Sequence, residues 1–279
     1  MPTSTEPDAE PDLRLIYFDI RGFAEPLRWM LTIRGVRFVD ERIPLDAWAS
    51  QRKRSSGGGG GGVGNLTTKP TDAKSKRKNS LNTATLMRFK KFVGQLPILY
   101  DGEDFVLTQT LTVMRYLARK YGFNGVTELE EAKADEVADL VYDLRLRAMD
   151  YEGSAFTSAT PDVVRHTVFR DFANAPESKA KEKMREDFIT MYFPLYFSKF
   201  ASILESSGGN YIAGENLTYG DLTLINFIEV VETLLDPNCL AEFPTLRALK
   251  ERIFAIPEIV QWRQDQKAAS EEYGFPETG

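Results

Sequence analysis

The chain has 279 residues, of which 42% are hydrophobic and 27% charged, values typical of a soluble globular protein with a sizeable core. A single cysteine, Cys239, excludes an intrachain disulfide, and a single histidine, His166, excludes a metal site built on two histidines, so we expect no bound metal. No apolar run approaches the roughly 18 residues of a membrane helix, and the acidic first dozen residues resemble no targeting signal. These features predict a cytoplasmic protein without a membrane partner.

The net charge of -6 is unevenly distributed along the chain. Residues 51–91 carry eleven basic residues and one acidic residue, a net charge of +10, which leaves -16 on the remainder. An acidic bulk argues against a nucleic-acid partner. Within the basic stretch, six consecutive glycines and a polar tract show no apolar periodicity. We therefore expect 51–88 to be a flexible insertion in a loop, and residues 1–12 to be a disordered tail.

The first ordered elements form a β-α-β pattern. Branched and aromatic residues at 13–18 predict a strand, and apolar spacing at 25–34 predicts a helix that ends at Gly35 in a left-handed cap. Residues 36–43 are a second candidate strand. Two strands joined by a helix imply a parallel pair with a right-handed crossover.

A hairpin and a second helix follow the insertion. A short strand begins near Leu96-Pro97, turns at Asp101-Gly102, and returns over 104–107. Thr108 is a candidate cap for a helix over 109–120, which Gly122 would end.

Everything after residue 122 has helical spacing. Long patterns cover 127–151 and 178–206, the second interrupted near Pro194, and Thr218 with Asp221 forms a capping-box pattern at the start of another helix. Helices over 243–255 and 257–268 complete the chain. The sequence therefore predicts an α/β domain over 13–122, which contains the insertion, and an all-helical domain over 123–279.

Three features of the α/β domain could carry chemistry. Tyr17 ends the first strand, where ligands gather in open sheets, although a strand tyrosine is more often packed in the core. A cis bond at Leu96-Pro97 would expose backbone groups to an extended peptide-like ligand, although most such bonds are trans. Gln109 and Thr110 begin a helix whose amino-terminal N–H groups suit a carboxylate, although plain capping is more common.

These features occur in an order that resembles cytosolic glutathione transferases. The stretch from Tyr17 to Arg28 is similar to the opening of the sigma class, which includes the glutathione-dependent prostaglandin D synthases, and residues 94–99 are similar to the cis-proline segment of the family. Gln109-Thr110 with the helix after it, and the segment 217–222, resemble two further family motifs. The resemblance spans about 13–48 and 92–275. It implies a thioredoxin-like domain joined to an all-α domain, usually in a homodimer, that conjugates glutathione to small hydrophobic electrophiles.

The resemblance also implies roles for individual residues. Tyr17 would stabilise the glutathione thiolate. The residues implied in glutathione binding are Trp48, Gln95, Leu96, Pro97, Gln109, Thr110 and Asp143. Within this set, Leu96 would bond the cysteinyl backbone, Gln109 and Thr110 the γ-glutamyl carboxylate. Asp143 would reach the γ-glutamyl amine across the dimer interface, and Asp135 and Asp139 on the same helix face are alternatives to it.

Departures from the family pattern keep other functions open. Phe23 replaces an arginine common in sigma members, which disfavours a prostaglandin isomerase, and the insertion begins where a lysine for the glycyl carboxylate is expected. Lys90, Lys91 or an insertion residue are candidates to replace that lysine. A structural or binding protein without catalytic activity is the alternative from another class, favoured by the long insertion.

Overall fold

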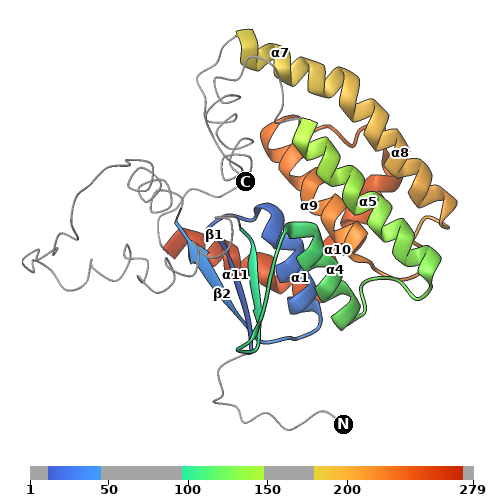
Figure 1. Cartoon of the computed structure of the whole chain (residues 1–279). Helices are drawn as coiled ribbons and strands as arrows, with labels where there is room; N and C mark the ends of the chain where they lie inside the picture. The colour runs from blue at the N-terminus through green and yellow to red at the C-terminus, as the bar shows by residue number, and fades with distance from the viewer. Residues whose placement is uncertain (1–11, 45–95, 148–178, 273–279) are drawn as a thin grey trace, which may run out of the picture.

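The structure, a computed structural model, describes residues 12–44, 96–147 and 179–272 (Figure 1). Its sheet has four strands in the order β2-β1-β3-β4. Their bounds are Leu13–Phe18 for β1, Phe38–Ile43 for β2, Ile98–Asp101 for β3 and Phe105–Thr108 for β4. β1 is parallel to β2, as the β-α-β pattern predicted, and β3 is antiparallel to both β1 and β4.

Strand β1 lies in the middle of this sheet. Leu15, Ile16, Tyr17 and Phe18 are all buried, although successive side chains of a strand point to opposite faces. A strand buried on both faces needs cover on both sides of the sheet. The continuous apolar run of this segment is therefore what its central position requires.

Helix α1 (Glu25–Ile33) returns the chain to the start of β2. Pro26 lies in its first turn, where the missing N–H costs nothing. Gly35, just beyond the helix, has φ +61°, so the predicted left-handed position is confirmed.

Helix α4 (Thr110–Tyr121) follows β4 directly and ends at Gly122, which has φ +72° as predicted. The prediction that Thr108 caps this helix is wrong. Thr108 is the last residue of β4, where it pairs with Ile98, and Gln109 occupies the N-cap position without a side-chain cap. The pairing of β4 with β3 extends the strand through the residue that local propensity favoured as a cap.

In the second half of the chain, the described elements are helices, as predicted. The helices are α5 (Glu128–Arg147), α7 (Lys179–Asp187), α8 (Phe193–Ser206), α9 (Tyr219–Leu234), α10 (Pro244–Phe254) and α11 (Pro257–Glu272). The predicted interruption near Pro194 is a π-helical turn, η3 (Phe188–Tyr192), and Pro194 lies in the first turn of α8. The capping box of Thr218 and Asp221 at the start of α9 is confirmed.

The two domains pack through α1 and α4 (Figure 1). Both helices lie between the sheet and the helical bundle, and both contact α9. Within the bundle α5 runs along α9, and a Cβ on Gly220 would lie 2.8 Å from the carbonyl oxygen of Ala134, so glycine permits this close approach. The predicted tail up to residue 11, the insertion 51–88 and His166 lie outside the described residues.

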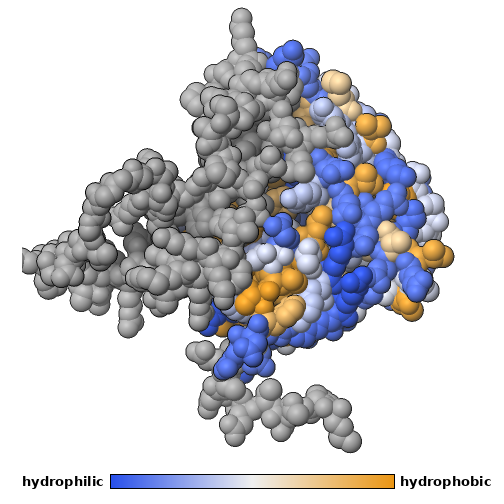
Figure 2. Space-filling model, viewed as in Figure 1, coloured by the Kyte–Doolittle hydropathy of each residue, from blue (hydrophilic) through white to orange (hydrophobic). Residues whose placement is uncertain are grey.

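Hydrophilic side chains cover most of the described surface in the view of Figure 2, with apolar patches between them. Among the helices of the described segments, none has the length and apolar character needed to cross a membrane.

Candidate functional site

One end of the sheet brings together three of the features that the sequence singled out. Ile16 of β1 pairs with Ile98 of β3, and Ile98 pairs with Thr108 of β4. Because β3 is antiparallel to both neighbours, the carboxyl ends of β1 and β4 lie beside the amino end of β3. The residues next to these pairs therefore lie at the same end of the sheet: Tyr17 on β1, Leu96-Pro97 before β3, and Gln109-Thr110 after β4.

The Tyr17 side chain is fully buried at this edge. Its exposed fraction is 0%, and its hydroxyl oxygen accepts a hydrogen bond of 3.2 Å from the backbone N–H of Phe23. Burial raises the pKa of Tyr17 to about 12, against the smaller lowering effects of that hydrogen bond and of Arg145 and Arg28. The phenol is thus packed in the core, and at neutral pH it keeps the proton that a hydrogen-bond donor needs.

The loop from β1 to α1 surrounds the Tyr17 hydroxyl. Gly22 has φ +47°, and a Cβ there would lie 2.8 Å from the hydroxyl oxygen. The Asn226 side-chain amide donates to the carbonyl oxygen of Gly22 at 2.9 Å, and Arg21 pairs with Glu229 at 2.9 Å. Asn226 and Glu229 both belong to α9, so the helical domain holds the loop that contacts Tyr17.

The other two features have unusual backbones. Leu96 and Pro97 are buried, and the peptide bond between them is cis. Gln109 has φ 73° and ψ 117°, although it is not a glycine, and its carbonyl oxygen accepts the N–H of Val113 at 2.9 Å. A residue held in this region costs about 1–3 kcal/mol, and such residues cluster at functional sites. Thr110, in the first turn of α4, is buried.

Helix α5 distinguishes the three acidic candidates. Asp135 and Asp139 both accept hydrogen bonds from Arg115 of α4, at 3.0 and 2.7 Å. Asp143 is exposed and, within the described parts of the chain, has neither a hydrogen bond nor an ion pair. The two alternatives, Asp135 and Asp139, are thus paired with Arg115, whereas Asp143 forms no such pair in the described segments. Trp48 and Gln95 lie outside the described residues.

Arg145 is a residue of this site that sequence reasoning missed. It lies on α5 with an exposed fraction of 5%, and its guanidinium stands 4.5 Å from the ring centroid of Phe23 and 5.3 Å from that of Phe227. Burial lowers the pKa of Arg145 to about 10, with Tyr17 acting in the opposite direction, so the side chain stays charged at neutral pH. The sequence signal for its burial is its position four residues after Val141, on the apolar face of the helix.

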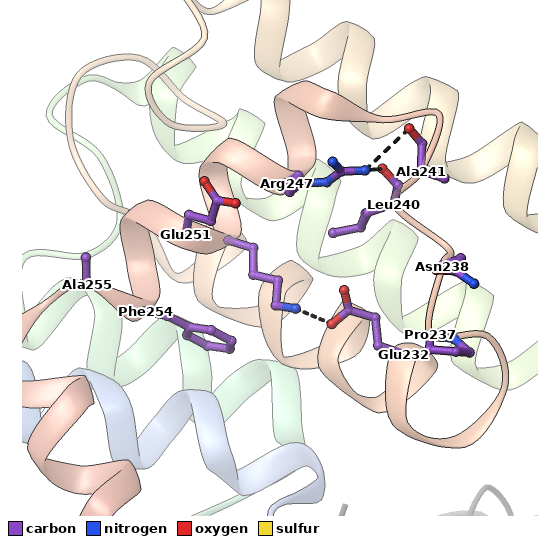
Figure 3. Close-up of a pocket in the computed structure, with 10 residues that line it drawn as sticks. Glu232, Pro237, Asn238, Leu240, Ala241, Arg247, Glu251, Phe254 and Ala255 are labelled. Carbon is purple, nitrogen blue, oxygen red and sulfur yellow. Dashed lines mark hydrogen bonds and ion pairs between the residues drawn. The ribbon is translucent and has the colours of Figure 1, made fainter.

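A hollow of about 690 Å³ opens elsewhere, between the end of α9, the loop after it and α10 (Figure 3). Its cationic groups are already paired within the chain: Lys250 with Glu232, and Arg247 with the carbonyl oxygen of Leu240 at 2.8 Å. None of the sequence-predicted site residues lines it. The nearby thiol of Cys239 is buried, which raises its pKa to about 12.

No group of three side chains suited to hold a metal ion occurs among the described residues. The site therefore consists of a buried phenol, a buried guanidinium, a cis-proline segment and the beginning of a helix.

Comparisons with known proteins agree with this architecture. Residues 162–266 match the family model of the glutathione S-transferase C-terminal domain. Glutathione S-transferase 2 of Onchocerca volvulus is 27% identical over 258 residues, which are 92% of this chain and 94% of the relative. Glutathione S-transferase 4 of Caenorhabditis elegans is 28% identical over 261 residues, 92% of this chain and 98% of the relative.

Solved structures give the same result for the fold. The Pi-class glutathione S-transferase of Onchocerca volvulus superposes with a TM-score of 0.64 at 26% identity, over 96% of this chain and 98% of that structure. Prostaglandin synthase D of Nilaparvata lugens gives 0.61 at 25% identity, over 92% and 99%. The predicted two-domain fold is confirmed. Together these matches show that the chain is similar to glutathione S-transferases in sequence and in fold over most of its length, and they identify it as a transferase.

Proposed function

We propose that the protein conjugates the glutathione thiolate to small hydrophobic electrophiles, with Tyr17 as the hydrogen-bond donor to sulfur. A free thiol has a pKa near ~8.5, whereas the nucleophile is the thiolate. A neutral phenol that donates to the sulfur favours the anion and lowers the pKa of the thiol. The single observation that supports this role is the meeting of Tyr17, the cis-proline segment and the start of α4 at one edge of the sheet.

The remaining site residues would hold the tripeptide. The backbone of Leu96, ahead of Pro97, would pair with the cysteinyl residue, and Gln109 and Thr110 at the start of α4 would bind the γ-glutamyl carboxylate. The unusual backbone of Gln109 supports this role, because strain of this kind is retained where a geometry is used.

Three further groups complete the proposed binding site. Trp48 would flank the glycyl end and Gln95 would lie beside the tripeptide. Asp143 would reach the γ-glutamyl amine of a second protomer in a homodimer. Its exposure and its lack of a partner in the described segments support that role.

We place the protein in a sigma-like class on the motif that begins at Tyr17. The similarity to prostaglandin synthase D supports a second candidate, a glutathione-dependent prostaglandin isomerase, which Phe23 disfavours. Product analysis with a prostaglandin endoperoxide as substrate distinguishes isomerisation from conjugation.

The proposal requires a thiol to reach a hydroxyl that is fully buried in the structure. Retention on immobilised glutathione tests this access, and a chlorodinitrobenzene conjugation assay tests turnover. Tyr17→Phe should lower kcat/KM at neutral pH by about tenfold for each unit by which the thiol pKa rises. Tyr121→Phe, at the far end of α4, is the matched control and should leave turnover unchanged. Retention without turnover in the wild type would instead identify a binding protein.

A further inference from the structure

Arg145 is a buried cation for which the described residues supply no compensating anion. Its Nε and Nη2 atoms are buried and have no hydrogen-bond partner among the described residues, and none of the ion pairs formed there includes Arg145. Burying an unpaired charge costs several kcal/mol, so proteins rarely retain one without a use. The two aromatic rings beneath the guanidinium offset only part of that cost, about 2 kcal/mol for a desolvated pair.

Arg28 shows what a structural buried arginine looks like in the same protein. It is also fully buried, but it binds Glu25 at 3.1 Å and Asp40 at 3.1 Å and donates to the carbonyl oxygen of Ile20 at 2.9 Å. Its charge is therefore neutralised inside the N-terminal domain. The environment of Arg145 offers no such carboxylate in the described parts of the chain.

Phe23 connects Arg145 with the Tyr17 hydroxyl. The backbone N–H of Phe23 donates to that hydroxyl at 3.2 Å, while its ring lies 4.5 Å from the guanidinium. Within the described segments, the charged and titratable groups that interact with Tyr17 include Arg145 from α5, Arg28 from α1 and Tyr142 from α5. Carboxylates already neutralise the charge of Arg28. Arg145 is therefore the arginine of this set whose positive charge has no carboxylate beside it in the described segments.

We propose that Arg145 provides the positive charge that stabilises the glutathione thiolate beside Tyr17. The inference rests on the proposed function and adds a second group to it. When the thiol loses its proton to water, the sulfur becomes the anion that the described residues do not provide for the buried guanidinium. Tyr17 directs one hydrogen bond to that sulfur, and Arg145, which stays protonated throughout, lowers the energy of the charged form.

The ultraviolet absorbance of enzyme-bound thiolate, followed as a function of pH, tests this role. Arg145→Met keeps most of the volume and removes the charge, and it should raise the pKa of bound glutathione by about one unit or more. Arg145→Lys should restore most of the shift. Arg34→Met is the matched control, because Arg34 also lies 4.5 Å from an aromatic centroid, that of Phe123, but is exposed and bonds the end of α4. It should leave the thiol pKa unchanged.

Affinity and melting temperature separate this role from a structural one. Arg145→Met should weaken glutathione binding but not binding of S-methylglutathione, which has no ionisable sulfur. Its melting temperature should match or exceed that of the wild type, because an unpaired buried charge has been removed. A lower melting temperature with equal losses for both ligands would show that Arg145 is structural.

Three further outcomes distinguish failure of the proposed function from failure of the role of Arg145. A wild type that binds glutathione without any thiolate absorbance at neutral pH would reject the proposed function itself. A wild type with that absorbance and an unchanged thiol pKa in Arg145→Met would reject only the role of Arg145. An effect confined to the KM of electrophiles that carry a carboxylate would also overturn it, by assigning the guanidinium to the second substrate.

Discussion

Replacing Asp221 by alanine tests how much one buried carboxylate contributes to the helical domain. Its Oδ1 accepts the backbone N–H of Ile212 at 2.7 Å, and its Oδ2 accepts the N–H of Thr218 at 2.8 Å and the Thr218 hydroxyl at 2.6 Å. All three residues have an exposed fraction of 0%. The carboxylate therefore joins the start of α9 to the segment that precedes it.

The expected loss follows from the groups left without partners. Alanine leaves two buried backbone N–H groups without an acceptor, and each such group costs about 1–3 kcal/mol, while the Thr218 hydroxyl can rotate toward another acceptor. We expect the free energy of unfolding to fall by about 4 kcal/mol, a large part of a typical total of about 5–15 kcal/mol. Asp221→Asn keeps one acceptor oxygen and should lose about half as much.

Urea unfolding followed by circular dichroism at neutral pH measures both losses. Asp265→Ala is the control, because Asp265 accepts one exposed hydrogen bond from Gln261 within α11, and it should stay within about 0.5 kcal/mol of the wild type. A loss below about 1 kcal/mol in Asp221→Ala, with an unchanged m value, would refute the reasoning that this carboxylate satisfies the two amides.

Other predictions concern pH, the Tyr17 loop and the domain contact. Burial raises the pKa of Asp221 to about 6, above its value of ~3.9 in the unfolded chain, so the stability that this group contributes is complete below pH ~4 and is lost as the pH rises through about 6. Relative to Asp221→Asn, the free energy of unfolding of the wild type should therefore fall by about 3 kcal/mol over this range in urea titrations. Gly22→Ala should displace Tyr17 and reduce turnover in the conjugation assay, whereas Gly35→Ala, also at positive φ but with nothing within 4 Å of its Cβ, should affect only stability. Trp262→Phe removes a bond of 2.8 Å from α11 to a carboxylate of α1 and should lower the free energy of unfolding by about 1–2 kcal/mol in the same urea assay.

Local sequence signals predicted the elements that depend on short-range chemistry. The strand ending at Phe18 was predicted with its observed bounds, since branched and aromatic residues are followed there by turn residues. Gly35 and Gly122 were recognised because only glycine adopts left-handed geometry without a steric cost. The error at Thr108 arose because a cross-strand pairing outweighed a local preference for capping.

The candidate site was less accessible to sequence reasoning. The shared edge of Tyr17, Pro97 and Gln109 followed from the family resemblance, and the strand register now supplies its geometric basis. The positive φ of Gln109 and the burial of Arg145 away from any described carboxylate depend on packing between elements distant in the chain. No local pattern encodes them, so they emerge only from coordinates.

The burial of Cys239 has a practical consequence. A thiol with a pKa raised to about 12 is almost wholly protonated at neutral pH, and protonated thiols react slowly with alkylating reagents. Reactive electrophiles should therefore modify this sulfur only slowly. The native chain also offers a silent background for spectroscopy, because a cysteine introduced at an exposed position would be the preferred site for a fluorophore or spin label.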